Sequence, residues 1–229
     1  MPRKLVAISI LLGTVSVMPA QEPRQNKDGI SITYANPNVK PIRAITAIAL
    51  ESHMPIGIVL GQNQDILCGS EKSFDIQNKT PKEALATIAA SVGYDLTEGQ
   101  GALVLTAGDL EPWQREVLDH RYKMYRGGTQ TTMSILGVNL TGAIRMDVGN
   151  ITTFASSTLH NPDNRRVTLG DEPNISTEEV ANKIVNLDGK GIWILRSTVD
   201  PPTGPADDEV RAYSYMDDSS AIQDLTCGP

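Results

Sequence analysis

Aromatic side chains are scarce in this chain: they make up 4% of its 229 residues, with only two Phe and two Trp. The core must therefore be built mainly from Ile, Leu, Val and Ala. Cysteine is also scarce, because only Cys68 and Cys227 occur. In an oxidising compartment these two could form a disulfide that ties the C-terminal tail to the first domain. Two unpaired thiols are the alternative, and the sequence does not choose between them.

Motifs that identify a reaction are absent. The histidines form neither an HxxxH nor an HExxH pair, and no GxSxG or SxxK motif supplies a serine nucleophile. The glycines at 99–101 and 189–191 lie in turns between elements, not in strand-to-helix loops that hold phosphate. One metal or acid–base site is conceivable, from Asp119, His120, His160 and Asp163. A helix-face histidine and an HNPD turn explain the same residues, so we predict no catalytic residue, no cofactor, no metal and no enzymatic activity.

Positive charge is in the minority, with 20 Lys and Arg against 27 Asp and Glu and a net charge of −7. Removal of Arg3 and Lys4 with a leader peptide would lower the net charge to about −9. An acidic surface argues against binding to nucleic acid through phosphates and against binding to anionic membranes.

The N-terminus has the pattern of a secretory signal peptide. Arg3 and Lys4 precede an apolar run, Leu5–Val17, that is too short to span a bilayer, and Pro19-Ala20 precedes a polar segment. We predict cleavage after Ala20, a disordered segment over 21–29, and a periplasmic or secreted protein. An uncleaved N-terminal anchor is the alternative.

The stretch Phe74–Thr106 carries the clearest structural signals. Thr80-Pro81-Lys82-Glu83 is a capping box with proline at the first helical position. Apolar residues then follow at helical spacing up to Val92, and Gly93 supplies a left-handed end. One strand, which contains Phe74 and Ile76, is predicted before the helix. Two more are predicted after it, at Tyr94–Thr97 and Ala102–Thr106, with a turn between them.

The residues before this stretch predict further elements. A strand is expected at Ile30–Tyr34, broken by Asn36-Pro37-Asn38, then a helix at Val39–Ser52, a strand at Ile56–Leu60 and a loop at Gly61–Gly69. The order over 30–106 is β-α-β, loop, β-α-β-β, which predicts a compact α+β domain. Residues 107–112 are the expected linker.

A second α+β domain is predicted over 113–199. Its expected elements begin with a helix at Trp113–Tyr125, followed by two strands or a strand–helix pair at Thr131–Val138 and Ala143–Val148. Next come a strand at Thr152–Leu159 followed by a turn, a strand at Arg166–Leu169, a helix starting at the capping box Ser176–Glu179, and a strand at Ile192–Leu195. The order of strand, capped helix, glycine turn and strand repeats that of Phe74–Thr106. A degenerate repeat and a chance recurrence of a common construction are both open. The tail 200–229 is expected to be mostly flexible, with Val210–Tyr215 as an edge strand.

Two segments, MPIGIVL and KTPKEALATIAASVGYDLTEGQGALVLT, resemble the STN domain, the short N-terminal domain of secretins and TonB-dependent receptors. The resemblance covers about Ile30–Thr106. It implies a bacterial protein–protein interaction module that binds an unidentified partner in the cell envelope, and it directs attention to the sheet edge nearest Ala102–Thr106 or to the loop Gly61–Gly69. The alternative is a secreted enzyme or carbohydrate-binding protein that uses the second domain. There Trp113, Trp193, Tyr122 and Tyr125 could stack on a sugar, although packing in the core or along a helix is the favoured explanation of these residues.

Overall fold

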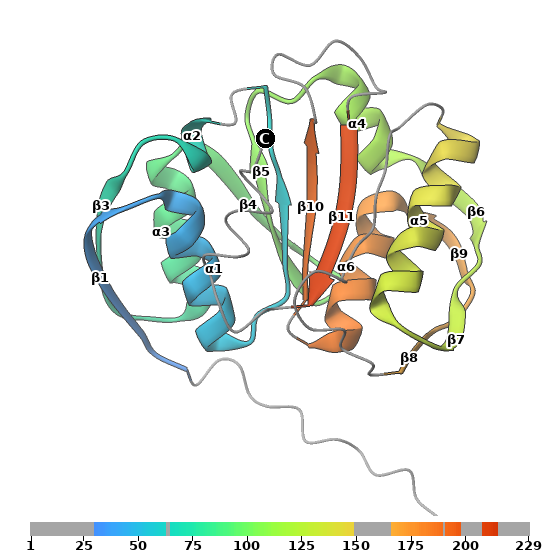
Figure 1. Ribbon diagram of the computed structural model, residues 1–229, viewed down its shortest axis with the longest axis horizontal. Coiled ribbons are helices and arrows are strands. Elements are labelled where there is room, and N and C mark those ends of the chain that lie inside the picture. Colours follow the sequence, from blue (N-terminus) through green and yellow to red (C-terminus); the bar gives the residue numbers. More distant parts are fainter. Residues whose placement is uncertain (1–29, 63–64, 149–165, 190, 198–207, 215–229) are drawn as a thin grey trace, which may run out of the picture.

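The computed structural model describes residues 30–62, 65–148, 166–189, 191–197 and 208–214 (Figure 1). Strands and helices alternate along the chain in several small sheets, so the protein has an α+β fold, as predicted. Among these residues, no helix combines the length and the hydropathy needed to cross a membrane. The predicted signal peptide, the segment 21–29, the strand at 152–159 and most of the tail lie outside the described residues.

The first half has the predicted order of elements, with one short helix added. The elements are β1 (Ile32–Val39), α1 (Pro41–Ser52), β2 (Ile56–Val59), α2 (Asp65–Cys68), β3 (Lys72–Lys79), α3 (Pro81–Ser91), β4 (Tyr94–Gly99) and β5 (Ala102–Ala107). The addition is α2, a single helical turn within the segment predicted as a loop. Its Leu67 is fully buried, which explains why this part of the loop is fixed against the core.

The second half is also built from alternating helices and strands. The elements are α4 (Pro112–Asp119), β6 (Arg121–Tyr125), β7 (Gly128–Thr131), α5 (Met133–Asp147), β8 (Val167–Leu169), β9 (Glu172–Ser176), α6 (Thr177–Asp188), β10 (Gly191–Ser197) and β11 (Asp208–Ser214). The predicted edge strand in the tail corresponds to β11, which pairs antiparallel with β10.

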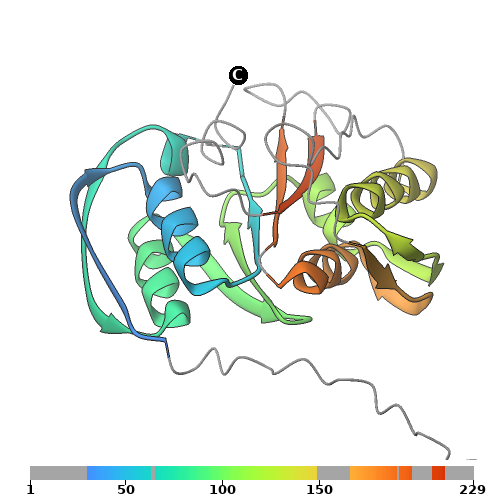
Figure 2. The ribbon, with the colours of Figure 1, turned by 60° about the horizontal axis from the view of Figure 1, so that its bottom comes forward.

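A five-stranded sheet in the centre of the molecule contains strands from both halves, in the order β11-β10-β2-β5-β4. β10 pairs in parallel with β2, and β2 pairs in parallel with β5. Figure 2 shows β2 and β10 side by side between the two groups of helices. Residues before and after the predicted linker therefore share one sheet.

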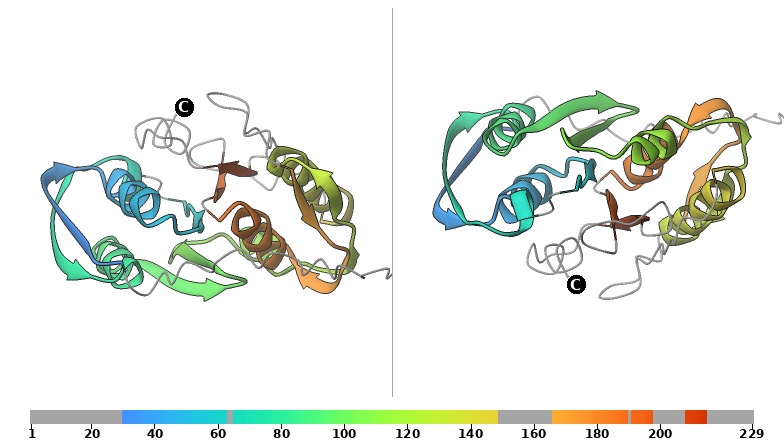
Figure 3. Two further views of the ribbon diagram at one scale, coloured as in Figure 1. Left: turned by 90° about the horizontal axis from the view of Figure 1, so that it is seen from below. Right: turned by 90° about the horizontal axis from the view of Figure 1, so that it is seen from above.

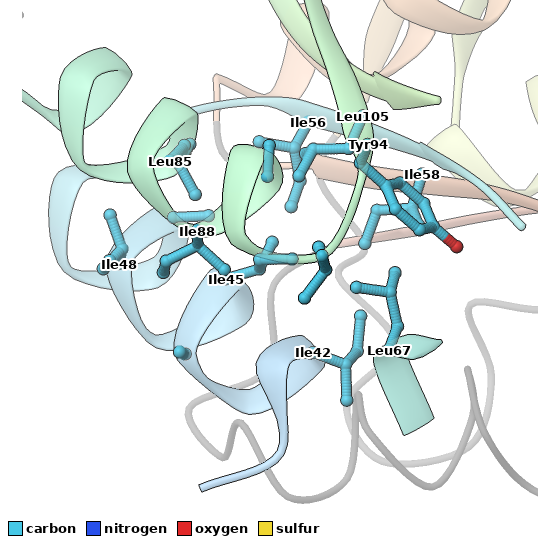
Figure 4. Packing of buried hydrophobic residues seen from close by; sticks show 14 of the residues in the cluster. Ile42, Ile45, Ile48, Ile56, Ile58, Leu67, Leu85, Ile88, Tyr94 and Leu105 are labelled. Atoms are coloured by element: carbon cyan, nitrogen blue, oxygen red, sulfur yellow. The ribbon is translucent and has the colours of Figure 1, made fainter. Parts of the chain in front are cut away.

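Helices cover both faces of this sheet. On one face Ile56, Ile58 and Leu105 pack against α1 and α3 (Figure 4). On the other face Val104 and Trp193 belong to a second core with residues of α4, α5 and α6. Outside the helices lie two-stranded ribbons, β1–β3 at one end and β6–β9 with β7–β8 at the other (Figure 3). Burial on both faces explains why the three inner strands are continuous apolar runs.

Both predicted capping boxes are confirmed. At α3, the Glu83 N–H donates to Thr80 Oγ1 at 3.3 Å and the Thr80 N–H donates to Glu83 Oε2 at 2.9 Å. At α6, the Glu179 N–H donates to Ser176 Oγ at 3.2 Å and the Ser176 N–H donates to Glu179 Oε2 at 2.7 Å. Gly93 follows α3 at φ 73°, in the predicted left-handed conformation.

Two predictions about local boundaries are wrong. Asn36-Pro37-Asn38 does not end β1, which continues to Val39 because its register with β3 shifts between Asn36 and Val39. The shift leaves Pro37 outside the paired positions of the ladder, where its missing N–H costs no hydrogen bond. The helix predicted at Trp113–Tyr125 ends at Asp119, and Arg121–Tyr125 is strand β6. Pairing with β9, fifty residues away, outweighs the helical spacing.

A third prediction is wrong in part. The strand expected at Thr131–Val138 is not formed, because β7 ends at Thr131 and α5 begins at Met133, whereas Ala143–Asp147 is helical, as in the predicted strand–helix pair. Leu136, Leu140 and Ile144 lie at helical spacing and are almost fully buried in the second core. This packing explains the helix despite two internal glycines, which weaken helices in isolation.

Candidate interaction edge

The predicted disulfide is described at one end only. Cys68 ends α2, is partly buried, and takes part in a disulfide. Cys227 lies outside the described residues, so its pairing with Cys68 stays a prediction.

The predicted metal or acid–base group is also only partly described. Asp119 is exposed at the end of α4, while His160 and Asp163 lie outside the described residues. The His120 ring instead faces α5: its Nε2 lies 3.5 Å from Asp147 Oδ2, and the ring contacts Tyr122 edge to face with centroids 4.9 Å apart. Within the described residues, no group of three or more His, Cys, Asp and Glu side chains is placed to hold a metal ion.

The aromatic residues proposed for sugar stacking do not share an open surface. Trp193 is 1% exposed, and its indole N–H donates to Asn182 Oδ1 at 2.7 Å beneath α6. Tyr122 and Tyr125 are buried as well, and burial raises the pKa of Tyr122 to about 12 although its hydroxyl bonds to Thr177. Only Trp113 of this group is partly exposed. Packing in the core therefore accounts for three of the four aromatic residues.

The stretch Ala102–Thr106 is not itself a sheet edge. It belongs to β5, which lies between β2 and β4 and is paired on both sides. The edge nearest to it is β4, the last strand of the sheet in this direction (Figure 1). We therefore define the candidate site as the outer edge of β4.

Two turns hold β4 in place. The chain enters it through Gly93 and leaves it through Gln100 and Gly101, whose φ angles of 51° and 80° are those of a tight hairpin turn. The tip of this hairpin rests on α6, because a Cβ at Gly101 would lie 2.6 Å from Asn186 Nδ2. The first half therefore supplies the edge, and α6 of the second half supports its tip.

The direction of the β4 backbone groups follows from the neighbouring strand. The Leu103 N–H donates to Pro55 O at 3.0 Å, towards β2 and away from β4. Glu98 lies opposite Leu103. In an antiparallel pair, the backbone N–H and C=O groups of two opposed residues point either towards each other or both away from the partner strand. The backbone groups of Glu98 therefore point outward, as do those of Leu96 and Tyr94 by alternation. Within the described residues, no hydrogen bond to the outward groups of Leu96 or Glu98 is found.

The side chains of β4 differ from those of the inner strands. Tyr94 is buried beside Ile58 (Figure 4), and burial, with Asp109 nearby, raises the pKa of its hydroxyl. Further along, the Glu98 carboxylate lies 2.5 Å from Lys82 Nζ of α3, and Asp95 is exposed. Charged side chains on an edge strand hinder unspecific strand pairing. This charge is the sequence signal that separates YDLTEG, as an edge strand, from the uncharged inner strands β2 and β5.

The comparisons with known proteins identify no relative. No protein-family model matches the chain, and no curated protein or solved structure matches it. The resemblance to the STN domain stays an expectation from the sequence.

Proposed function

We propose that this protein is an exported interaction module of the bacterial cell envelope that binds a partner protein by adding a strand to the outer edge of β4. The main support is the row of outward backbone groups at Tyr94, Leu96 and Glu98. An extended partner segment would hydrogen-bond to these groups and extend the central sheet, a common mode of peptide recognition. The predicted signal peptide and the STN-like pattern of Ile30–Thr106 support the cellular setting.

The edge is suited to reversible binding for two physical reasons. β4 is held by its antiparallel pairing with β5 and by the contact of the hairpin tip with α6, so little ordering of the edge accompanies binding. Its charges oppose unspecific aggregation, so a partner must match both the backbone pattern and the side chains.

A pair of substitutions at Glu98 tests the proposal. Glu98→Pro removes the outward N–H at a position where an edge strand tolerates proline, and it also removes the ion pair with Lys82. Glu98→Ala removes only the ion pair, which is worth about 0–1 kcal/mol at an exposed site. Equal urea midpoints for the two variants would show that both fold.

The readout is cross-linking from a photoreactive residue at Asp95, in cells that export the protein, followed by mass spectrometry of the adduct. We expect the same adduct for the wild type and Glu98→Ala, and its loss for Glu98→Pro. An adduct of unchanged yield with Glu98→Pro would refute strand addition at this edge.

A further inference from the structure

The elements around β4 have counterparts in the second half of the chain. β3, α3, β4 and β5 follow one another in the first half, and β9, α6, β10 and β11 do so in the second. Both helices begin with a capping box, and each is followed by a glycine at positive φ, Gly93 at 73° and Gly189 at 75°. The strand after each helix then pairs antiparallel with the next strand. In the order of elements along the chain, β10 therefore corresponds to β4, although in the sheet β4 and β11 are the two outer strands.

β4 and β10 differ at their second edge, which is the edge that does not pair with the following strand. β10 uses this edge to pair in parallel with β2, with Ile192 opposite Ile56 and Leu195 opposite Val59. The same edge of β4 ends the sheet. We infer that the partner strand occupies this edge of β4 as β2 occupies that of β10: it runs parallel to β4 and comes from an extended segment of another protein that carries Lys or Arg. This inference rests on the proposed function, because it specifies the direction and the chemistry of the strand that β4 accepts.

Charge selects the kind of partner. Asp95 is exposed on one face of β4, and the Glu98 side chain, 56% exposed, lies on the other with Lys82 beside it. Opposite charges on neighbouring strands stabilise a sheet, whereas like charges directly opposite each other destabilise it. The whole chain is also negatively charged, with a net charge of −7, and this charge favours the approach of a basic segment.

A second copy of the chain is a poorer occupant. Its β4 would place a second acidic edge beside the outer edge of β4, with another Asp95 and another Glu98. Its β2, the strand that fits β10, is already paired on both sides with β10 and β5. The partner is therefore a different protein with a free extended segment.

Synthetic peptides test the direction and the charge together. The probe is an eight-residue peptide with the β2 sequence Ile-Gly-Ile-Val between pairs of lysines, with a nitroxide label at its N-terminus. The matched control carries glutamates in place of the lysines. Binding to the ¹⁵N-labelled full chain is followed by NMR, through hydrogen-exchange protection of the Leu96 and Glu98 amides and through the signals that the nitroxide broadens.

We expect the lysine peptide to protect both amides and its label to broaden Tyr94 more than Gln100, because a parallel strand starts beside the start of β4. The glutamate peptide should bind about tenfold more weakly at low salt, and Glu98→Pro should abolish binding where Glu98→Ala does not.

Several results would overturn the inference. Stronger broadening at Gln100 would mean antiparallel addition, which leaves the proposed function intact. Equal affinity of the glutamate and lysine peptides would show that the partner segment does not have to be basic. Protection that rises with protein concentration in the absence of peptide would assign the edge to a second copy. Absence of protection with either peptide would also overturn it, whereas the cross-linking result at Glu98 would still decide the proposed function.

Discussion

Substitution of Gly57 by alanine tests the arrangement on which the central sheet depends. A Cβ at this position in β2 would lie 2.3 Å from Trp193 Cε2 and 2.6 Å from its Nε1. The indole cannot move freely, because it is 1% exposed and its N–H donates to Asn182 Oδ1 at 2.7 Å. Any shift that relieves the clash disturbs both its packing and this hydrogen bond.

The expected cost is substantial for one methyl group. Overpacking of a well-filled core costs about 1–3 kcal/mol, and loss of the buried indole hydrogen bond adds about 1 kcal/mol. We expect Gly57→Ala to lower the free energy of unfolding by about 2–4 kcal/mol, a large share of the 5–15 kcal/mol typical of a folded protein. Urea unfolding followed by far-UV circular dichroism should show a midpoint lowered by roughly 1 M or more.

Gly99→Ala in β4 is the matched control, because its Cβ would meet only Asn182 Nδ2 at 3.5 Å, an ordinary contact. A double-mutant cycle adds a second check. Combined with Trp193→Leu, which makes room at the same place, Gly57→Ala should cost at least about 1 kcal/mol less than it does alone. Equal stability of the Gly57 and Gly99 variants, or strictly additive effects in the cycle, would mean that Trp193 does not pack over β2 and that the parallel pairing of β10 with β2 is wrong.

Three further predictions concern stability. Thr80→Ala should lower the free energy of unfolding by about 1 kcal/mol in urea, because it removes the N-cap of α3; an unchanged midpoint would contradict the capping box. Burial, with the carboxylate of Asp119 nearby, raises the pKa of Glu178 above its ordinary 4.5. Ionisation therefore opposes folding, and Glu178→Gln should stabilise the protein at pH 7 but not at pH values below the ordinary pKa, where both forms are neutral; equal gains at both pH values would exclude this cause. Peptide mapping without reductant should recover Cys68 joined to Cys227, and Cys68→Ser should cost up to about 5 kcal/mol, since the bond would close a loop of roughly 160 residues; a free thiol at either cysteine would refute the pairing.

Local signals predicted the helices α3 and α6 well. Each begins at a capping box and is followed by a glycine at positive φ, and these interactions join residues only a few positions apart. The helix predicted at Trp113–Tyr125 failed for the opposite reason. Its second part pairs with β9, and the Tyr122 hydroxyl bonds to Thr177 Oγ1 at 3.1 Å, across about fifty residues of sequence. No local pattern contains that information.

The candidate site likewise combines features set by the local sequence with features set by pairing between distant segments. The resemblance and the strand pattern directed attention to the edge nearest Ala102–Thr106, but which strand forms that edge depends on pairing with distant partners. β5 is an inner strand because β2 lies on its far side, and β4 is the edge because it lies last in the order. The acidic residues of β4 were visible in the sequence, yet their meaning required the order of the strands.

By itself the sequence determined the capped helices, the glycine turns and the apolar strands, because these depend on residues close together in the chain. Only the tertiary structure decided that β10 lies against β2, that Trp193 packs over Gly57, and that the outward backbone groups of β4 end the sheet. These features depend on pairing between segments far apart in the sequence, and the same strand pattern is compatible with several neighbours.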